Sequence, residues 1–182
     1  MKKLKLKTGV FLLGGLILGA LVGMLILRQD PGESASKDRL LPPTVGTEVP
    51  DFELSTLGGS SLALNSIRGK PLVINFWTTW CGPCKEEMPL LEAYAQKYTG
   101  KLVVMGINSA ENEETVQPYI DDMEISFPIL LDKAGIVSDR YFVKNFPYTF
   151  FVDENGILRG QHIGLLSEER LMMYLKTIGI EP

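Results

Sequence analysis

The only two cysteines of the 182-residue chain, Cys81 and Cys84, are separated by two residues in the stretch FWTTWCGPCKEEMP. A pair with this spacing can be a redox couple, half of a zinc site or a structural disulfide. A zinc site would need two further ligands, and the chain has one histidine, His162, and no third cysteine. A disulfide that closes so short a loop would contribute little to stability. The sequence therefore favours a redox couple, with no metal and no other cofactor.

The cysteine pair follows an apolar run, PLVINFW, and opens a segment with helical periodicity over residues 84–98. Free N–H groups and the helix dipole at a helix N-terminus stabilise a thiolate, which makes Cys81 the candidate nucleophile. Cys84 lies one turn further along the same side and can resolve a mixed disulfide. Pro83 is tolerated in a first helical turn because it lacks an N–H, and Gly82 lets another polypeptide approach closely.

The elements that must position this pair are short and alternate from residue 51 onward. Their expected order is β-β-β-α-β-α-β-α-β-β-α, which predicts a mixed sheet between helices, of α/β class. We expect strands at 51–54, 60–64, 71–77, 101–108, 127–131, 148–153 and 156–164, and helices at 84–98, 115–123, 136–142 and 167–178. The first two strands flank a turn at 56–59 and predict a hairpin.

The N-terminus has a different composition. Four lysines within residues 1–7 precede an uncharged apolar run at 8–27, which would span roughly 30 Å as a helix, enough for a bilayer core. A cleaved signal peptide is the alternative, but the run ends in Leu27-Arg28-Gln29-Asp30, with no small-x-small site at its end. The pattern predicts a cytoplasmic segment at 1–7, a transmembrane signal anchor at 8–27, a polar linker at 28–44 and one extracytoplasmic domain at 45–182.

Charged residues elsewhere indicate no further site. With 18 basic and 22 acidic residues, the chain lacks the basic excess of a nucleic-acid-binding protein. Glu111, Glu113 and Glu114 are expected to form the solvated start of a helix rather than a metal site. His162, on a strand near the end of the chain, is expected to be structural.

Three stretches together resemble the thioredoxin superfamily, and more narrowly the membrane-anchored ResA/TlpA-type thiol–disulfide oxidoreductases. They are NFWTTWCGPCKEEMP, the entry phrase VGTEVPDFEL and the later FPYTFFVDENGILRG. The resemblance extends from residue 45 to about residue 178. It implies a thioredoxin-like core with an added N-terminal β-hairpin and a central insertion, here preceded by one transmembrane helix.

The resemblance also implies roles for site residues. Cys81 would be the attacking thiol and Cys84 the resolving one, and Trp80 would flank the disulfide at the surface. Pro147 would be a cis-proline facing the cysteines, and its neighbour Phe146 would offer backbone groups to an extended substrate. The bulky Phe146 departs from the small or β-branched residue usual in the family.

Two more positions narrow the subfamily. Asn75 stands where cytosolic thioredoxins carry a buried aspartate, so that proton acceptor is missing. ResA-like members resemble this chain in having a glutamate three residues after the second cysteine, here Glu87. Helical spacing places Glu87 near Cys84 at the edge of the buried face, where partial desolvation would raise its pKa and suit it to exchange protons with Cys84.

The expected function is an extracytoplasmic, membrane-anchored reductant of disulfides in client proteins such as apocytochrome c, with electrons from a membrane thiol–disulfide donor. A disulfide-forming oxidant on the same fold is one alternative. A non-catalytic copper- or peptide-binding thioredoxin-like module is another. The threonine-to-cysteine spacing of the related thiol peroxidases is absent, which does not favour that activity.

Overall fold

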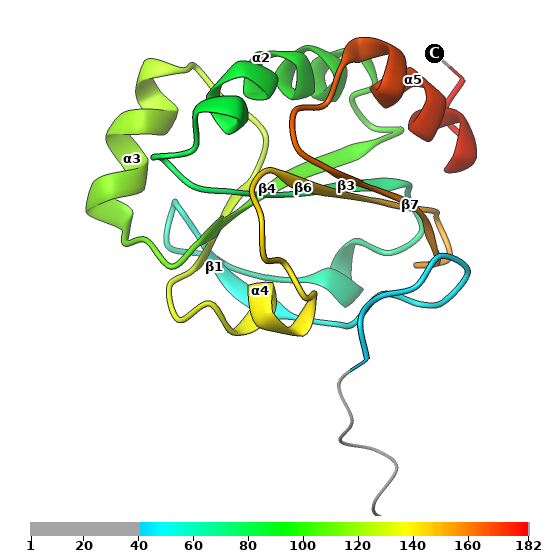
Figure 1. The fold of residues 1–182 in the computed structure, drawn as a ribbon, viewed down its shortest axis with the longest axis horizontal. Helices are drawn as coiled ribbons and strands as arrows, with labels where there is room; N and C mark the ends of the chain where they lie inside the picture. Colours follow the sequence, from blue (N-terminus) through cyan, green and yellow to red (C-terminus); the bar gives the residue numbers. More distant parts are fainter. Residues whose placement is uncertain (1–40, 182) are drawn as a thin grey trace, which may run out of the picture. The chain divides into compact units, whose positions relative to one another are not determined.

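A computed structural model describes residues 41–181, which form a seven-stranded mixed sheet in the order β2-β1-β5-β4-β3-β6-β7, with helices on both faces (Figure 1). The strands are β1 (Glu53–Thr56), β2 (Ser61–Ala63), β3 (Leu72–Trp77), β4 (Val103–Ser109), β5 (Ile129–Asp132), β6 (Tyr148–Val152) and β7 (Leu158–Ile163). The helices are the 3-10 helix η1 (Leu64–Ile67) and the α-helices α2 (Gly82–Lys97), α3 (Glu113–Asp122), α4 (Ile136–Arg140) and α5 (Glu168–Thr177).

The centre of the sheet is made by the strands with the most continuous apolar sequence. All six residues of β3 are buried, because helices cover both of its faces. It pairs in parallel with β4 and antiparallel with β6. The cysteine pair follows β3 after residues 78–80, so the active segment emerges from a strand that is buried along its whole length.

Two hydrophobic clusters fill the space above and below the sheet. Helices α2, α3 and α5 lie on one face, and α4 and η1 lie on the other (Figure 1). Met88, Leu91, Val116 and Leu171 belong to the first cluster, together with both cysteines. The second cluster lies on the opposite face and includes Phe76, Tyr141 and Phe150.

The predicted α/β class, the element order and the N-terminal hairpin are confirmed. The hairpin is not separate from the core, because β1 also pairs antiparallel with β5 and extends the sheet. Helix α2 begins at Gly82, two residues earlier than the periodic segment indicated, and η1 was not predicted.

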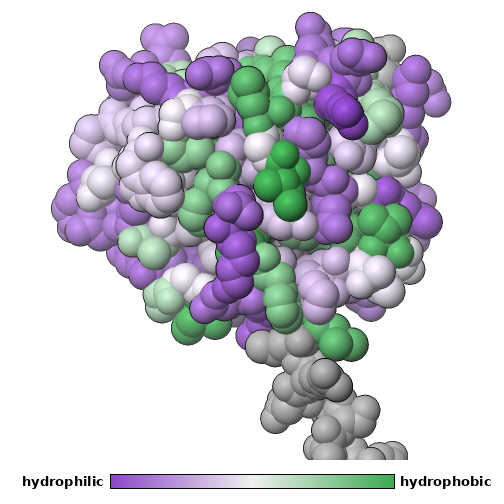
Figure 2. Space-filling view, viewed as in Figure 1, coloured by the Kyte–Doolittle hydropathy of each residue, from purple (hydrophilic) through white to green (hydrophobic). Residues whose placement is uncertain are grey.

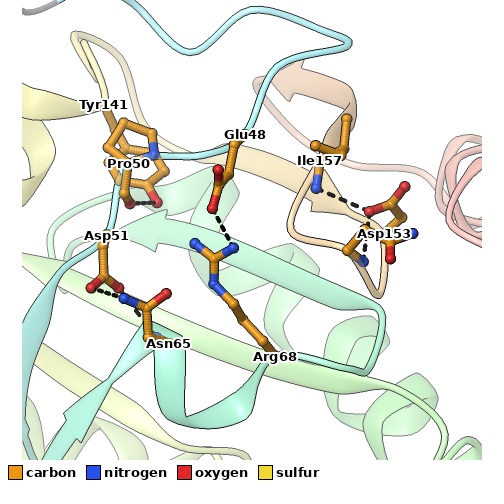
Figure 3. Close-up of polar contacts among 9 residues, drawn as sticks. Glu48, Pro50, Asp51, Asn65, Arg68, Tyr141, Asp153 and Ile157 are labelled. Atoms are coloured by element: carbon orange, nitrogen blue, oxygen red, sulfur yellow. Dashed lines mark hydrogen bonds and ion pairs between the residues drawn. The ribbon is translucent and has the colours of Figure 1, made fainter.

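The segment before β1 is fastened to the turn between β6 and β7. Gly46 N–H donates to the carbonyl of Leu158 at 2.8 Å, Leu158 N–H donates to Thr47, and Val49 N–H donates to Gly156. Figure 3 shows Glu48 paired with the guanidinium of Arg68 close to this turn. These contacts hold residues 46–49 against the end of β6 that is farther from Pro147.

The predictions for the N-terminal segment concern residues that the structure largely does not describe. The proposed anchor at 8–27 and most of the linker lie outside the described residues. Within residues 41–181, no helix has the length and apolar character needed to cross a membrane. On the face seen in Figure 2, hydrophobic residues are scattered in small groups among hydrophilic ones.

Candidate active site

The cysteine pair forms a disulfide at the N-terminus of α2, with an S–S distance of 2.06 Å. Cys81 is the N-cap residue of the helix, and its sulfur accepts a hydrogen bond from the backbone N–H of Cys84 at 3.2 Å. Helix-terminal N–H groups of this kind stabilise a negatively charged sulfur. The predicted position of Cys81 at a helix start is therefore what the structure shows.

The two sulfurs differ in access. Cys81 is 5% exposed and Cys84 is fully buried, so of the two cysteines only Cys81 has surface that a partner could meet. Gly82 and Pro83 between them are exposed, and a Cβ atom at Gly82 would meet nothing within 4 Å. The space over the first turn of α2 is thus open to a partner, as the sequence predicted.

Two aromatic side chains flank the disulfide. Trp80 is 72% exposed, and its ring meets the ring of Phe146 edge-on, with the ring centroids 5.9 Å apart. The Phe146–Pro147 peptide bond is cis, as the resemblance implied. The carbonyl of Pro147 accepts a hydrogen bond from Gly164 N–H at 2.8 Å, which ties this loop to the end of β7.

Glu87 lies on α2 one turn after Cys84, and only 1% of it is exposed. One carboxylate oxygen accepts from Nδ2 of Asn75 at 2.7 Å, and the other accepts from the backbone N–H of Leu166 at 2.8 Å. Burial raises the pKa of Glu87 to about 7, against the two hydrogen bonds, which favour the charged form. A carboxyl with this pKa can both accept and donate a proton near neutral pH.

Asn75 connects this carboxyl to the centre of the sheet. Its Nδ2 also donates to the hydroxyl of Thr149 at 3.0 Å, and Asn75 and Thr149 are opposite each other in the pairing of β3 with β6. Both side chains are fully buried. A neutral amide therefore fixes Glu87 without adding a second ionisable group beside it.

Thr149 and Leu166 were not identified from the sequence. Leu166 contributes a backbone N–H, a group that no side-chain pattern reveals. Thr149 lies opposite Asn75 in the pairing of β3 with β6, and it is the only buried polar residue of β6. Once β6 is placed beside β3, these two facts identify it as a partner of Asn75.

The expectation for Glu111 was wrong. Helix α3 begins at Glu113 with Asn112 as its N-cap, and Glu111 lies before it, half-buried, where it accepts hydrogen bonds from Thr79 and Asn108. The sequence missed this role because a run of glutamates looks like a solvated helix start. Glu114 is exposed, as expected.

His162 makes a contact that fits the structural role predicted for it. Its Nε2 lies 3.1 Å from the carbonyl of Leu165, within the turn after β7. In residues 41–181, no group of three or more His, Cys, Asp or Glu side chains is placed to hold a metal ion.

Comparisons with known proteins agree with a redox site built on the cysteine pair. Residues 45–161 match the model of the AhpC/TSA family. The chain is 40% identical to thioredoxin-like protein YneN of Bacillus subtilis over 129 residues, which cover 69% of this chain and 75% of YneN. It is 33% identical to thiol-disulfide oxidoreductase ResA of Bacillus anthracis over 179 residues, covering 98% and 99% of the two chains.

Solved structures show the same fold. A protein from Chlorobium tepidum assigned as thiol:disulfide interchange protein DsbE has a TM-score of 0.70 at 26% identity, with 75% of this chain and 99% of that chain covered. StoA of Bacillus subtilis has a TM-score of 0.60 at 26% identity, with 72% and 98% covered. The chain therefore belongs to the AhpC/TSA family of thioredoxin-like proteins, and with its Cys81–Cys84 pair it is a thiol–disulfide oxidoreductase.

Proposed function

We propose that the protein reduces disulfides in client proteins outside the cytoplasm while held at the membrane by its N-terminal segment. One observation carries the proposal for its chemistry: a reachable Cys81 stands beside a fully buried Cys84, and the buried carboxyl of Glu87 follows one helical turn later. This arrangement separates the group that meets the client from the groups that complete the exchange.

The first step is attack by Cys81. In the reduced protein, the Cys81 thiolate attacks one sulfur of the client disulfide. A Cys81–client S–S bond forms, the client S–S bond breaks, and the second client sulfur leaves as a thiolate that takes up a proton. The N–H groups at the start of α2 favour the thiolate before the attack.

The second step requires Cys84 to lose its proton in a buried place. Glu87 accepts this proton in its carboxylate form, and the Cys84 thiolate then attacks the Cys81 sulfur. The Cys81–client bond breaks, and Glu87 supplies the proton to the client thiolate as it leaves. Two electrons have passed to the client, and the protein holds the Cys81–Cys84 disulfide.

Several observations support the reducing direction and its setting. The CGPC pair resembles that of reducing thioredoxins, and the ResA/TlpA resemblance supports apocytochrome c as the client. A reductant outside the cytoplasm must be recharged, since its surroundings oxidise thiols, so we assign it a membrane thiol–disulfide donor. The basic residues 1–7 followed by the apolar run 8–27 support a single-pass anchor with the domain on the extracytoplasmic side.

A Cys84→Ala variant tests the proposed function. It can make the first step but not the second, so it should accumulate mixed disulfides with its clients through Cys81. A Cys81→Ala, Cys84→Ala double variant is the matched control. Recovery of an apocytochrome c from cells with the single variant alone supports the maturation role, and recovery of no disulfide-linked partner contradicts it.

Two further measurements separate the alternatives. A reduction potential near about −270 mV fits a reductant, whereas one near about −120 mV fits a disulfide-forming oxidant. A binding module that needs no redox chemistry would keep its function in cells with Cys81→Ser, and an enzyme would lose it.

A further inference from the structure

The segment that joins β3 to α2 is a tight turn. The N–H of Cys81 donates to the carbonyl of Thr78 at 3.3 Å, and Thr79 and Trp80 are the two central residues of the turn. Trp80, the exposed residue of the turn, and Cys81, the cysteine with some exposed surface, lie at its end. The conformation of the turn therefore sets how both of them meet a client.

Glu111 holds this turn from outside. One carboxylate oxygen accepts from the backbone N–H of Thr79 at 2.8 Å, and the other accepts from the Thr79 hydroxyl at 2.5 Å. The first oxygen also accepts from Nδ2 of Asn108 at 2.7 Å. Asn108 is fully buried near the end of β4, opposite Trp77 at the end of β3. The carboxylate thus connects the turn, which follows β3, to the neighbouring strand β4.

The chain places Glu111 at this point by an unusual backbone conformation. Ala110 has φ 58°, in the left-handed region that residues with a side chain rarely adopt. Its N–H donates to the carbonyl of Asp132 at 3.0 Å, which fixes the bend against β5.

We propose that Glu111 is a positioning residue for thiol–disulfide exchange, because its hydrogen bonds to Thr79 hold Cys81 and Trp80 in the geometry from which a client disulfide is attacked. Displacement at sulfur needs the attacking, central and leaving sulfurs nearly in line, so a small displacement of Cys81 slows it strongly. The inference rests on the reducing direction proposed above and is independent of the client and of the membrane location.

The test compares Glu111→Ala with Glu111→Gln, and uses Glu114→Ala as the control because Glu114 is exposed in the same acidic run. The reduced proteins react with insulin, as a protein disulfide, and with iodoacetamide, as a small reagent for Cys81. We expect Glu111→Ala to lower the kcat/KM for insulin by about tenfold or more, since it removes hydrogen bonds to a charged group. Alkylation by iodoacetamide needs no alignment on the turn and should change less than about threefold.

The conservative variant and a second site sharpen the result. Glu111→Gln keeps one acceptor oxygen for Thr79 and should recover much of the insulin rate. Thr79→Val removes only the hydroxyl donor, and we expect a fall of about two- to fivefold that does not add to the loss in Glu111→Ala. This variant keeps the backbone hydrogen bond, so it tests the contact even where Glu111→Ala fails to fold.

Three outcomes overturn the proposal. They are insulin reduction by Glu111→Ala at the rate of the Glu114→Ala control, an equal loss in insulin reduction and alkylation, and full additivity of the Thr79→Val and Glu111→Ala losses. A wild-type protein that does not reduce insulin at all would instead contradict the proposed reducing function, so the two failures are distinguishable.

Discussion

Replacement of Glu87 by glutamine should remove a pH-dependent part of the stability of the oxidised domain. The carboxyl of Glu87 is 1% exposed, and its pKa is raised from 4.5 to about 7 in the folded protein, chiefly by burial. The folded protein therefore keeps this proton to a higher pH than the unfolded chain does. Stability contributed by the protonated carboxyl is present below about pH 4.5 and is lost as the pH rises towards 7.

The size of the effect follows from the shift. At about 1.36 kcal/mol per pH unit, a rise from 4.5 to about 7 makes the oxidised protein about 3 kcal/mol less stable at pH 8 than it would be with Glu87 protonated. About 2 kcal/mol of this loss falls between pH 5.5 and pH 8. Glutamine carries no charge at either pH, so the variant should not show this loss.

The assay is urea unfolding of the oxidised protein at several pH values from 5.5 to 8. The pKa values of Glu92 and Asp153 are lowered by their hydrogen bonds, so these carboxylates are ionised throughout this window. Glu86→Gln is the control, because Glu86 is exposed and precedes Glu87 directly. Wild type and Glu86→Gln should lose stability together as the pH rises. A Glu87→Gln curve parallel to theirs would refute a raised pKa at Glu87.

Other changes give further expected outcomes. Asn75→Asp places a second carboxyl within hydrogen-bonding distance of Glu87, so the pH at which client release is half-maximal should rise by about one unit or more; an unchanged pH–rate profile would contradict this. In Gly160→Ala, the new Cβ would lie 2.5 Å from a ring carbon of Tyr174, which is stacked on Phe151 and cannot easily move away. Thermal unfolding should show a loss of about 1–3 kcal/mol, and an unchanged melting temperature would show that the ring moves aside.

Most of the fold could be predicted from local patterns. The central strands are continuous apolar runs, and α2 and α5 carry clear periodicity and caps, so their positions are evident in the sequence alone. The order of strands could not be predicted in the same way. The pairing of β1 with β5 joins residues more than seventy positions apart, and it depends on the tertiary packing of two short strands inside the sheet.

The candidate site was predictable where chemistry is concentrated in a motif. Cys81 and Cys84 follow from their spacing at a helix start, and Glu87 follows from the resemblance to ResA-like proteins together with helical spacing. The environment of Glu87 depends on a backbone N–H from Leu166, 79 positions later, which leaves no trace in residue types. Glu111 was missed for a related reason: solvated and anchoring glutamates look alike until a distant donor such as Thr79 is brought next to one of them.

The fastening of residues 46–49 to the turn between β6 and β7 also places the start of the domain away from its redox site. Strand β6 runs from the cis-proline loop beside the redox site to this turn, and its five residues extend roughly 17 Å. Residues 46–49 and the redox site therefore lie at opposite ends of β6, so a partner can occupy the redox end without displacing the contacts that fasten residues 46–49.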